Sequence, residues 1–228
     1  MEHRGRSLAF AVRLVDRFTG DEPSDGVTIE AASIDASPVK NPSGYHLFFD
    51  LEPSEVTLVV DGGDRYVDHR CHVVLEPEDA AAGEAPDEGE PPTHVVTDPS
   101  DPLVVSLSPT PAYAFPTTST VLRGHVRDGA GEPVEGASVS LRAFDPVVET
   151  TGTGEYALWV PASAEHVVRR NGGNVVVVDG LTGNGRRAAD GGGGTNPTLV
   201  VSHPDYADVA ERIEVTAGTR TVCHVTLE

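Results

Sequence analysis

The sequence of 228 residues lacks long apolar runs and contains only two cysteines. Its N-terminal stretch, MEHRGRSLAFAVRLVDRFTG, alternates polar and apolar residues and has no apolar core of roughly 7–15 residues, as a signal peptide would. No later stretch approaches the roughly 18 apolar residues of a membrane span. The few cysteines indicate a reducing compartment and give no disulfide framework. We therefore expect a cytoplasmic protein, or one carried in an assembled particle, without membrane contact.

Lysine is also nearly absent. The 16 basic residues include a single lysine, Lys40, and they face 36 acidic residues, which gives a net charge of −20. Such an acidic, lysine-poor composition is typical of proteins adapted to high salt, where carboxylates hold water and cations. It also repels phosphate backbones, and the basic pairs Arg169-Arg170 and Arg186-Arg187 are too short for a nucleic-acid surface. Binding to DNA or RNA is therefore not expected.

Motifs of catalysis and of cofactor binding are missing as well. The sequence has no His-Glu-x-x-His, no His-x-x-Glu and no Gly-x-Ser-x-Gly, and it has no Gly-Lys-Ser/Thr ending of a phosphate loop. We therefore expect no enzyme, no catalytic residue and no cofactor.

Two Cys-His pairs are the strongest candidates for a metal site. His69, Cys71 and His72 lie together, and Cys223 is followed by His224. On a strand, however, each cysteine shares a face with apolar residues while the following histidine points the other way. A core role for the cysteines is favoured over zinc ligation, which needs about four convergent ligands. No metal site is predicted.

What the sequence does contain is a series of short Val-, Thr-, Ile-, Leu- and Tyr-rich runs with a period near two, separated by its 18 prolines and 24 glycines. This pattern predicts an all-β fold. Residues 77–102 are acidic and rich in Ala, Gly and Pro, which indicates a linker. We expect two tandem β-sandwich domains at residues 5–76 and 119–228, with an extended Pro/aromatic arm at 103–118.

The two halves also resemble each other. Residues 9–34 align with residues 120–144, and Gly44-Tyr45 aligns with the Gly154-Glu155-Tyr156 turn. The ends RCHVVLE, residues 70–76, and VCHVTLE, residues 222–228, align as final strands, preceded by Tyr66 and Tyr206 respectively. A duplicated module is the simplest explanation.

The second half resembles carboxypeptidase regulatory-like domains. The resemblance covers residues 120–228 and is carried by LRGHVRDGAGEPVEGASVSL, TGTGEYAL and LVVSHPDY, which begin at residues 122, 151 and 199. It implies a transthyretin-like, seven-stranded sandwich. The opening Gly is absent from the first half, where the likeness is fainter. A regulatory-like domain after a Pro-aromatic segment is also similar to accessory proteins of contractile, phage-tail-like injection systems, here in a haloarchaeal setting.

Two segments are not explained by a sandwich and are candidate protein-binding sites. In residues 103–118, Tyr113 and Phe115 either anchor a neighbouring protein or seal their own second domain, and we favour the second role. Residues 162–197 interrupt the second module, either as a disordered insertion or as an edge strand, with Val175 and Val177, that recruits a partner by β-augmentation. The predicted function is a non-catalytic structural or adaptor protein in a large assembly. The alternative is a carbohydrate- or surface-binding module of an exported protein.

Overall fold

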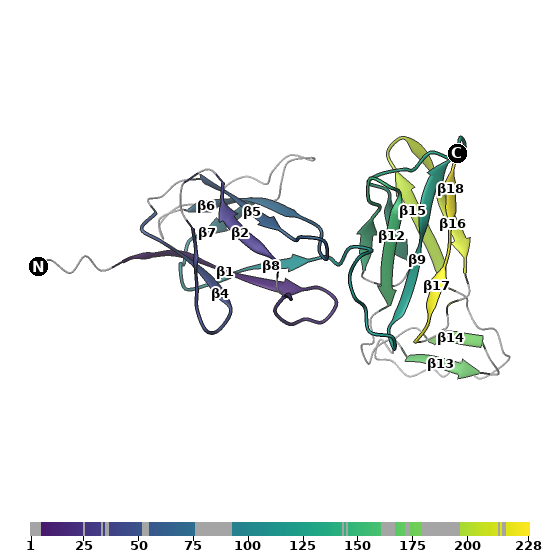
Figure 1. The fold of residues 1–228 in the computed structure, drawn as a ribbon, viewed down its shortest axis with the longest axis horizontal. Coiled ribbons are helices and arrows are strands. Elements are labelled where there is room, and N and C mark those ends of the chain that lie inside the picture. The colour runs from purple at the N-terminus through teal and green to yellow at the C-terminus, as the bar shows by residue number, and fades with distance from the viewer. Residues whose placement is uncertain are drawn as a thin grey trace, which may run out of the picture. The chain divides into compact units, whose positions relative to one another are not determined.

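A computed structural model of the chain describes residues 6–24, 26–32, 34, 37–51, 55–75, 93–142, 144, 146–160, 167–171, 174–178, 197–213, 215 and 218–228. Every regular element in these residues is a β-strand, so the all-β prediction is confirmed. None of them forms a helix that is long and apolar enough to cross a membrane. The chain divides into two compact units, Met1–Ala112 and Tyr113–Glu228, each built from facing sheets (Figure 1).

The first unit consists of two four-stranded sheets. One has the order β3-β4-β1-β8, and the other has the order β2-β5-β6-β7. In both sheets the last strand named is an edge strand that runs parallel to its neighbour. The strands of the first sheet are β1 (Leu8–Asp16), β3 (Val39–Lys40), β4 (Tyr45–Phe49) and β8 (Leu103–Leu107). Those of the second are β2 (Thr28–Ala31), β5 (Glu55–Asp61), β6 (His69–Leu75) and β7 (Thr93–Val96).

Alternation of side chains builds the core between these sheets. The period-two pattern buries every second residue of β5 and β6 and exposes the residues between them more. On the first sheet, the rings of Phe10 and Phe48 are stacked with their centroids 4.5 Å apart. Both rings are fully buried, which fixes the register of β1 on β4 because a slip of one residue would turn them outward.

The second unit has the same general plan. One sheet is β12-β9-β17, with β18 also pairing with β9, and the other is β11-β10-β15-β16. β13 and β14 form a separate two-stranded sheet. The bounds are β9 (Thr120–Asp128), β10 (Ser138–Leu141), β11 (Val147–Glu149), β12 (Glu155–Val160), β13 (Val167–Asn171), β14 (Asn174–Val178), β15 (Thr198–His203), β16 (Tyr206–Arg212), β17 (Arg220–Val222) and β18 (Val225–Leu227).

A close backbone approach shapes the middle of this unit. The sheet is interrupted between β17 and β18 at Cys223, whose carbonyl oxygen accepts a 2.8 Å hydrogen bond from the Tyr156 hydroxyl. A Cβ atom at Gly124 would lie 1.6 Å from the same carbonyl oxygen. Glycine is therefore required at this point of β9 because any side chain would displace the last strand.

The boundaries predicted around the linker differ from those of the structure. Residues 77–92 of the expected linker lie outside the described residues. Residues 93–96, however, form β7, and residues 103–107, expected in the arm, form β8. Both strands belong to sheets of the first unit, which therefore extends to Ala112 and not to residue 76. The sequence did not predict these two short edge strands because acidic residues and prolines flank them and their partner strands are not adjacent to them in the sequence.

The internal repeat is seen in the topology, with one exception. β1 and β9 both begin their units and both end on an aspartate, Asp16 and Asp128, whose carboxylate accepts backbone N–H groups of the following turn. β4 and β12 both pair antiparallel with these strands. The alignment of the two Cys-His segments is wrong. Cys71 lies in β6, which pairs with β5, whereas the strands around Cys223 pair parallel with β9 as β8 does with β1.

Candidate protein-contact surface

The two edge strands β7 and β8 differ in composition from the opposite edges of the same sheets. β7 reads THVV and β8 reads LVVSL, so neither contains Asp, Glu, Lys or Arg. The opposite edges, β2 and β3, carry Glu30 and Lys40. Charged side chains on an edge strand discourage pairing with another chain. β7 and β8 lack this protection.

Two valines increase the apolar character of these edges. The side chain of Val95 on β7 is 46% exposed, and that of Val104 on β8 is 53% exposed. Single exposed apolar residues are ordinary on a protein surface. Here they lie on neighbouring uncharged edges that border one cavity, and this combination makes the region a candidate contact surface.

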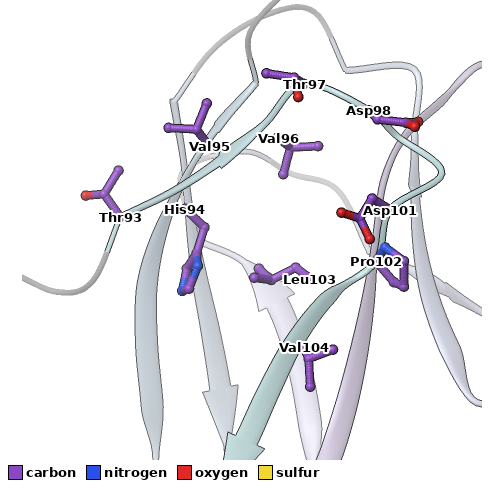
Figure 2. A pocket seen from close by; sticks show the side chains of 10 residues that line it. All are labelled: Thr93, His94, Val95, Val96, Thr97, Asp98, Asp101, Pro102, Leu103 and Val104. Atoms are coloured by element: carbon purple, nitrogen blue, oxygen red, sulfur yellow. The ribbon is translucent and has the colours of Figure 1, made fainter. Parts of the chain in front are cut away.

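The cavity between the two strands has a volume of about 370 Å³. It is lined by Thr93 to Asp98 and by Asp101 to Val104, which are β7, the start of β8 and the loop that joins them. Figure 2 shows the side chains of Val96 and Leu103 over the space between the strands. Both are half-buried.

The rim of the cavity is acidic. Asp98 and Asp101 lie on the loop that carries the chain from one sheet to the other. The hydroxyl and the N–H group of Ser100 donate to Asp98 Oδ1 at 2.6 and 2.8 Å, and these bonds hold the pKa of Asp98 below its usual range. No lysine or arginine is among the residues that line the cavity. The surface therefore presents apolar side chains beside negative charge.

The hydrogen bonds of β8 show which of its backbone groups point toward β1 and which point away from it. The carbonyl of Leu107 accepts from Arg17 N–H at 3.0 Å, on the side of β1. The carbonyl of the next residue, Ser108, accepts from Val67 N–H at 2.9 Å, on the other side. Because successive residues of an edge strand turn their backbone groups to opposite sides, Val104 and Ser106 direct theirs away from β1.

The sequence placed a candidate binding site at Tyr113 and Phe115. Phe115 is buried, with its ring centroid 6.3 Å from that of Trp159 and 4.7 Å from that of Tyr113. The Arg123 guanidinium lies 5.7 Å from the Phe115 ring centroid and donates to the Tyr113 carbonyl, while Arg220 donates to the Phe115 carbonyl. The segment thus packs on the second unit. Tyr113 is half-buried, and its role toward a partner stays a prediction.

The other predicted contact residues, Val175 and Val177, lie on β14. This strand pairs with β13 in an antiparallel hairpin, in which Val175 is opposite Arg170 and Val177 is opposite Val168. The expected strand is therefore present, although one of its edges is already paired. Its recruitment of a partner stays a prediction, and the remainder of the insertion 162–197, apart from Pro197, lies outside the described residues.

The cysteines of the two Cys-His segments lie in different settings. Cys71 is fully buried beside Val73, and burial raises the pKa of its thiol to about 11. Cys223 is half-buried at the break between β17 and β18, where burial also raises the pKa of its thiol. In the described part of the chain, no three His, Cys, Asp or Glu side chains come close enough to hold a metal ion.

The strongest candidate surface was missed by the sequence. Val95 and Val104 lie inside or next to the segment interpreted as a linker, so neither was proposed as a contact residue. The available signal was the pair of short alternating runs, THVV and LVVSL, on either side of a Pro-Ser-Asp-Pro turn. Such an arrangement is typical of two strands joined by a loop.

Comparisons with known proteins identify no relative by sequence. No protein-family model matches the chain, and no curated protein matches it. Among solved structures it is similar to the minor pilin of the Gram-positive pathogen Streptococcus agalactiae, with 8% identity and a TM-score of 0.26 over 83% of this chain and 66% of that one. A streptococcal ancillary pilin shows 11% identity and a TM-score of 0.26, over 100% of this chain and 64% of that one.

The shaft pilin of Lactobacillus rhamnosus GG gives 9% identity and a TM-score of 0.21, with 98% of each chain covered. By contrast, the chain spans slightly less than two thirds of the length of the minor pilin and of the ancillary pilin. At this identity and TM-score the likenesses carry no conclusion about function.

Proposed function

We propose that the chain is a non-catalytic structural or adaptor protein that contacts other proteins through the edges of its β-sandwiches. The observation that carries this proposal is the pair of uncharged edge strands β7 and β8, with exposed Val95 and Val104, around one cavity. An edge strand presents unpaired N–H and C=O groups and is a template for another chain. The opposite edges of the two sheets carry charged residues and β7 and β8 do not, which favours a contact surface at β7 and β8.

Composition supports contacts of this kind. With a net charge of −20, the surface repels itself at low salt. In a cytoplasm of high ionic strength, salt screens these charges, and the Debye length at 1 M salt is only about 3 Å. Backbone pairing and apolar contacts persist under such conditions. We place the protein in a salt-rich cytoplasm or in a particle assembled there.

A contractile, phage-tail-like injection system is the specific assembly that we propose. The support is the resemblance of the sequence of the second half to regulatory-like domains that follow a Pro-aromatic segment, together with the packing of Phe115 against Trp159 in the second unit. A role in sugar binding is less well supported because Trp159, the single tryptophan, is buried and offers no exposed platform.

Affinity purification of the tagged chain from its own cells, followed by mass spectrometry and negative-stain imaging, tests the proposal. We expect partner proteins at fixed stoichiometry, and tail, sheath or baseplate proteins if the specific assembly is correct. Recovery of the chain alone would contradict an adaptor role. Binding to a glycan array in the same salt, together with recovery of the chain alone, would support a carbohydrate-binding module instead.

A further inference from the structure

We propose that β8 accepts an extended, basic segment of a partner protein as the fifth strand of its sheet, with apolar side chains of that segment in the neighbouring cavity. This inference rests on the proposed function and names the site and the chemistry of the partner. It is carried by the backbone of β8, by the cavity beside it and by the charge around the cavity.

The outer edge of β8 already pairs with another segment just beyond its end. Ser108 C=O accepts from Val67 N–H at 2.9 Å, and Thr110 N–H donates to Arg65 C=O at 2.8 Å, around an antiparallel bridge between Tyr66 and Pro109. The same edge continues along Val104 and Ser106, where no hydrogen bond to another described backbone group is found. An added strand would therefore extend a pairing that the chain itself begins.

The open edge has defined ends. The Tyr66–Pro109 bridge closes it after Leu107, and the loop with Asp98 and Asp101 closes it before Leu103. The five residues of β8 span about 17 Å at roughly 3.3 Å per residue. The site therefore fits a short strand of about five residues.

The cavity gives this strand a place for its side chains. A strand added to β8 would lie about 4.8 Å from it, over the gap between the two sheets. Its inward side chains would then contact Val96 and Leu103, with His94 beside them on the same face of β7. The volume of about 370 Å³ lies near the lower end of the roughly 300–1000 Å³ typical of ligand pockets. It is large enough for one or two side chains of the added strand.

Charge determines the kind of segment. Asp98 and Asp101 stand at the rim, and no lysine or arginine lines the cavity. A segment with Lys or Arg at the end that reaches the loop is therefore complementary. A second copy of this chain, with its own charge of −20, is repelled at low salt.

A peptide-binding experiment on the full chain tests the site. The probe is a short fluorescein-labelled peptide that alternates valine and threonine and ends in a lysine pair, followed by fluorescence anisotropy. A peptide with a glutamate pair in place of the lysines is the matched probe. We expect the lysine peptide to bind and the glutamate peptide to bind at least about tenfold more weakly at 0.1 M salt, with a smaller difference at 1 M, where charges are screened.

Two pairs of variants locate the binding. Ser106→Pro removes an outward N–H that the sheet does not use, whereas Ser106→Ala keeps it. We expect Ser106→Pro to weaken binding at least about tenfold and Ser106→Ala to leave it unchanged, with circular dichroism to verify folding. Asp101→Lys should weaken the lysine peptide several-fold, and Asp208→Lys, the same charge change on the exposed strand β16, should not.

Three results would overturn the proposal. They are no binding of the lysine peptide, equal binding of the two peptides at 0.1 M salt, and unchanged binding to folded Ser106→Pro. If Ser106→Pro does not fold, unchanged binding of the lysine peptide to Asp101→Lys overturns the proposal instead. Sedimentation that shows a wild-type dimer lost in Ser106→Pro would assign the edge to a second copy instead. If peptides fail while native purification returns partners, the adaptor function stands without this site; if both fail, neither stands.

Discussion

Replacing Phe115 with alanine should destabilise the second unit by about 3–5 kcal/mol, the range for truncating a buried phenylalanine. The Phe115 ring is only 3% exposed. It forms a pair with the Trp159 ring at 6.3 Å and has the Arg123 guanidinium at 5.7 Å. Aromatic pairs and cation–π contacts each add about 0.5–1.5 kcal/mol. We therefore expect a value in the upper part of the range.

Urea unfolding followed by tryptophan fluorescence measures this effect selectively. Trp159 is the single tryptophan and lies on β12, so its emission reports the second unit alone. With a denaturant slope of about 2 kcal/mol/M for a domain of this size, the midpoint should fall by about 1.5–2.5 M. Because domains are stable by only about 5–15 kcal/mol, this is a large fraction of the total.

Tyr113→Ala is the matched control because Tyr113 adjoins Phe115 and is half-buried. We expect a loss of about 1 kcal/mol in this variant, since less area leaves water. An unchanged midpoint in Phe115→Ala would refute the packing role of Phe115. If that variant kept its stability but lost co-purifying proteins, the segment would be an anchor for a partner instead.

Three further predictions concern single groups. Gly124→Ala should cost about 2–3 kcal/mol in the same urea assay, because its Cβ would overlap the Cys223 carbonyl; an unchanged midpoint would contradict this packing. The Cys71 thiol has a pKa of about 11 against about 8.5 in an unfolded chain, so its contribution to the stability of the first unit is complete below pH 8.5 and should fall by about 2.5 kcal/mol by pH 10.5. Cys71→Val should therefore show a smaller alkaline loss of stability by circular dichroism, and equal losses would contradict this. Asp16→Ala should cost about 3 kcal/mol of stability because Asp16 is buried and hydrogen-bonded, and Asp128→Ala should cost about 1 kcal/mol because Asp128 is half-buried. Thermal melting measures both, and equal costs would contradict this explanation by burial.

Much of the fold was predictable because it depends on local patterns. Alternation of apolar and polar residues identified the strands, and it correctly placed Cys71 on a buried face with Val73. The aspartates that end β1 and β9 were recognisable as turn residues, since their side chains bond to the backbone within a few residues. Such features need no knowledge of distant partners.

The features that were missed depend on long-range pairing. Residues 93–96 form a strand only because they lie parallel to β6, across the segment 76–92. Residues 103–107 likewise pair with β1, which is next to them in the sheet but at the other end of the unit's sequence. Strands of four and five residues that stand between prolines and acidic residues give a weak local signal. The candidate site consists of these two strands, and so it was not predicted.

A similar reason explains the wrong alignment of the two Cys-His segments. Short strands with one buried face are built from few residue types, so unrelated strands can look alike. RCHVV and VCHVT match although one lies in β6 and the other spans β17 and β18. Their partners, β5 for the first and β9 for the second, distinguish them. Pairing, and not composition, identifies a strand in a duplicated fold.

The most direct test of a protein-contact function is the size at which the native chain sediments in a gently prepared lysate of its own cells, at the salt concentration of that cytoplasm. We predict that it sediments with a large particle and that proteins of constant proportion accompany it across the gradient. Sedimentation of the whole population as a free monomer would contradict the account.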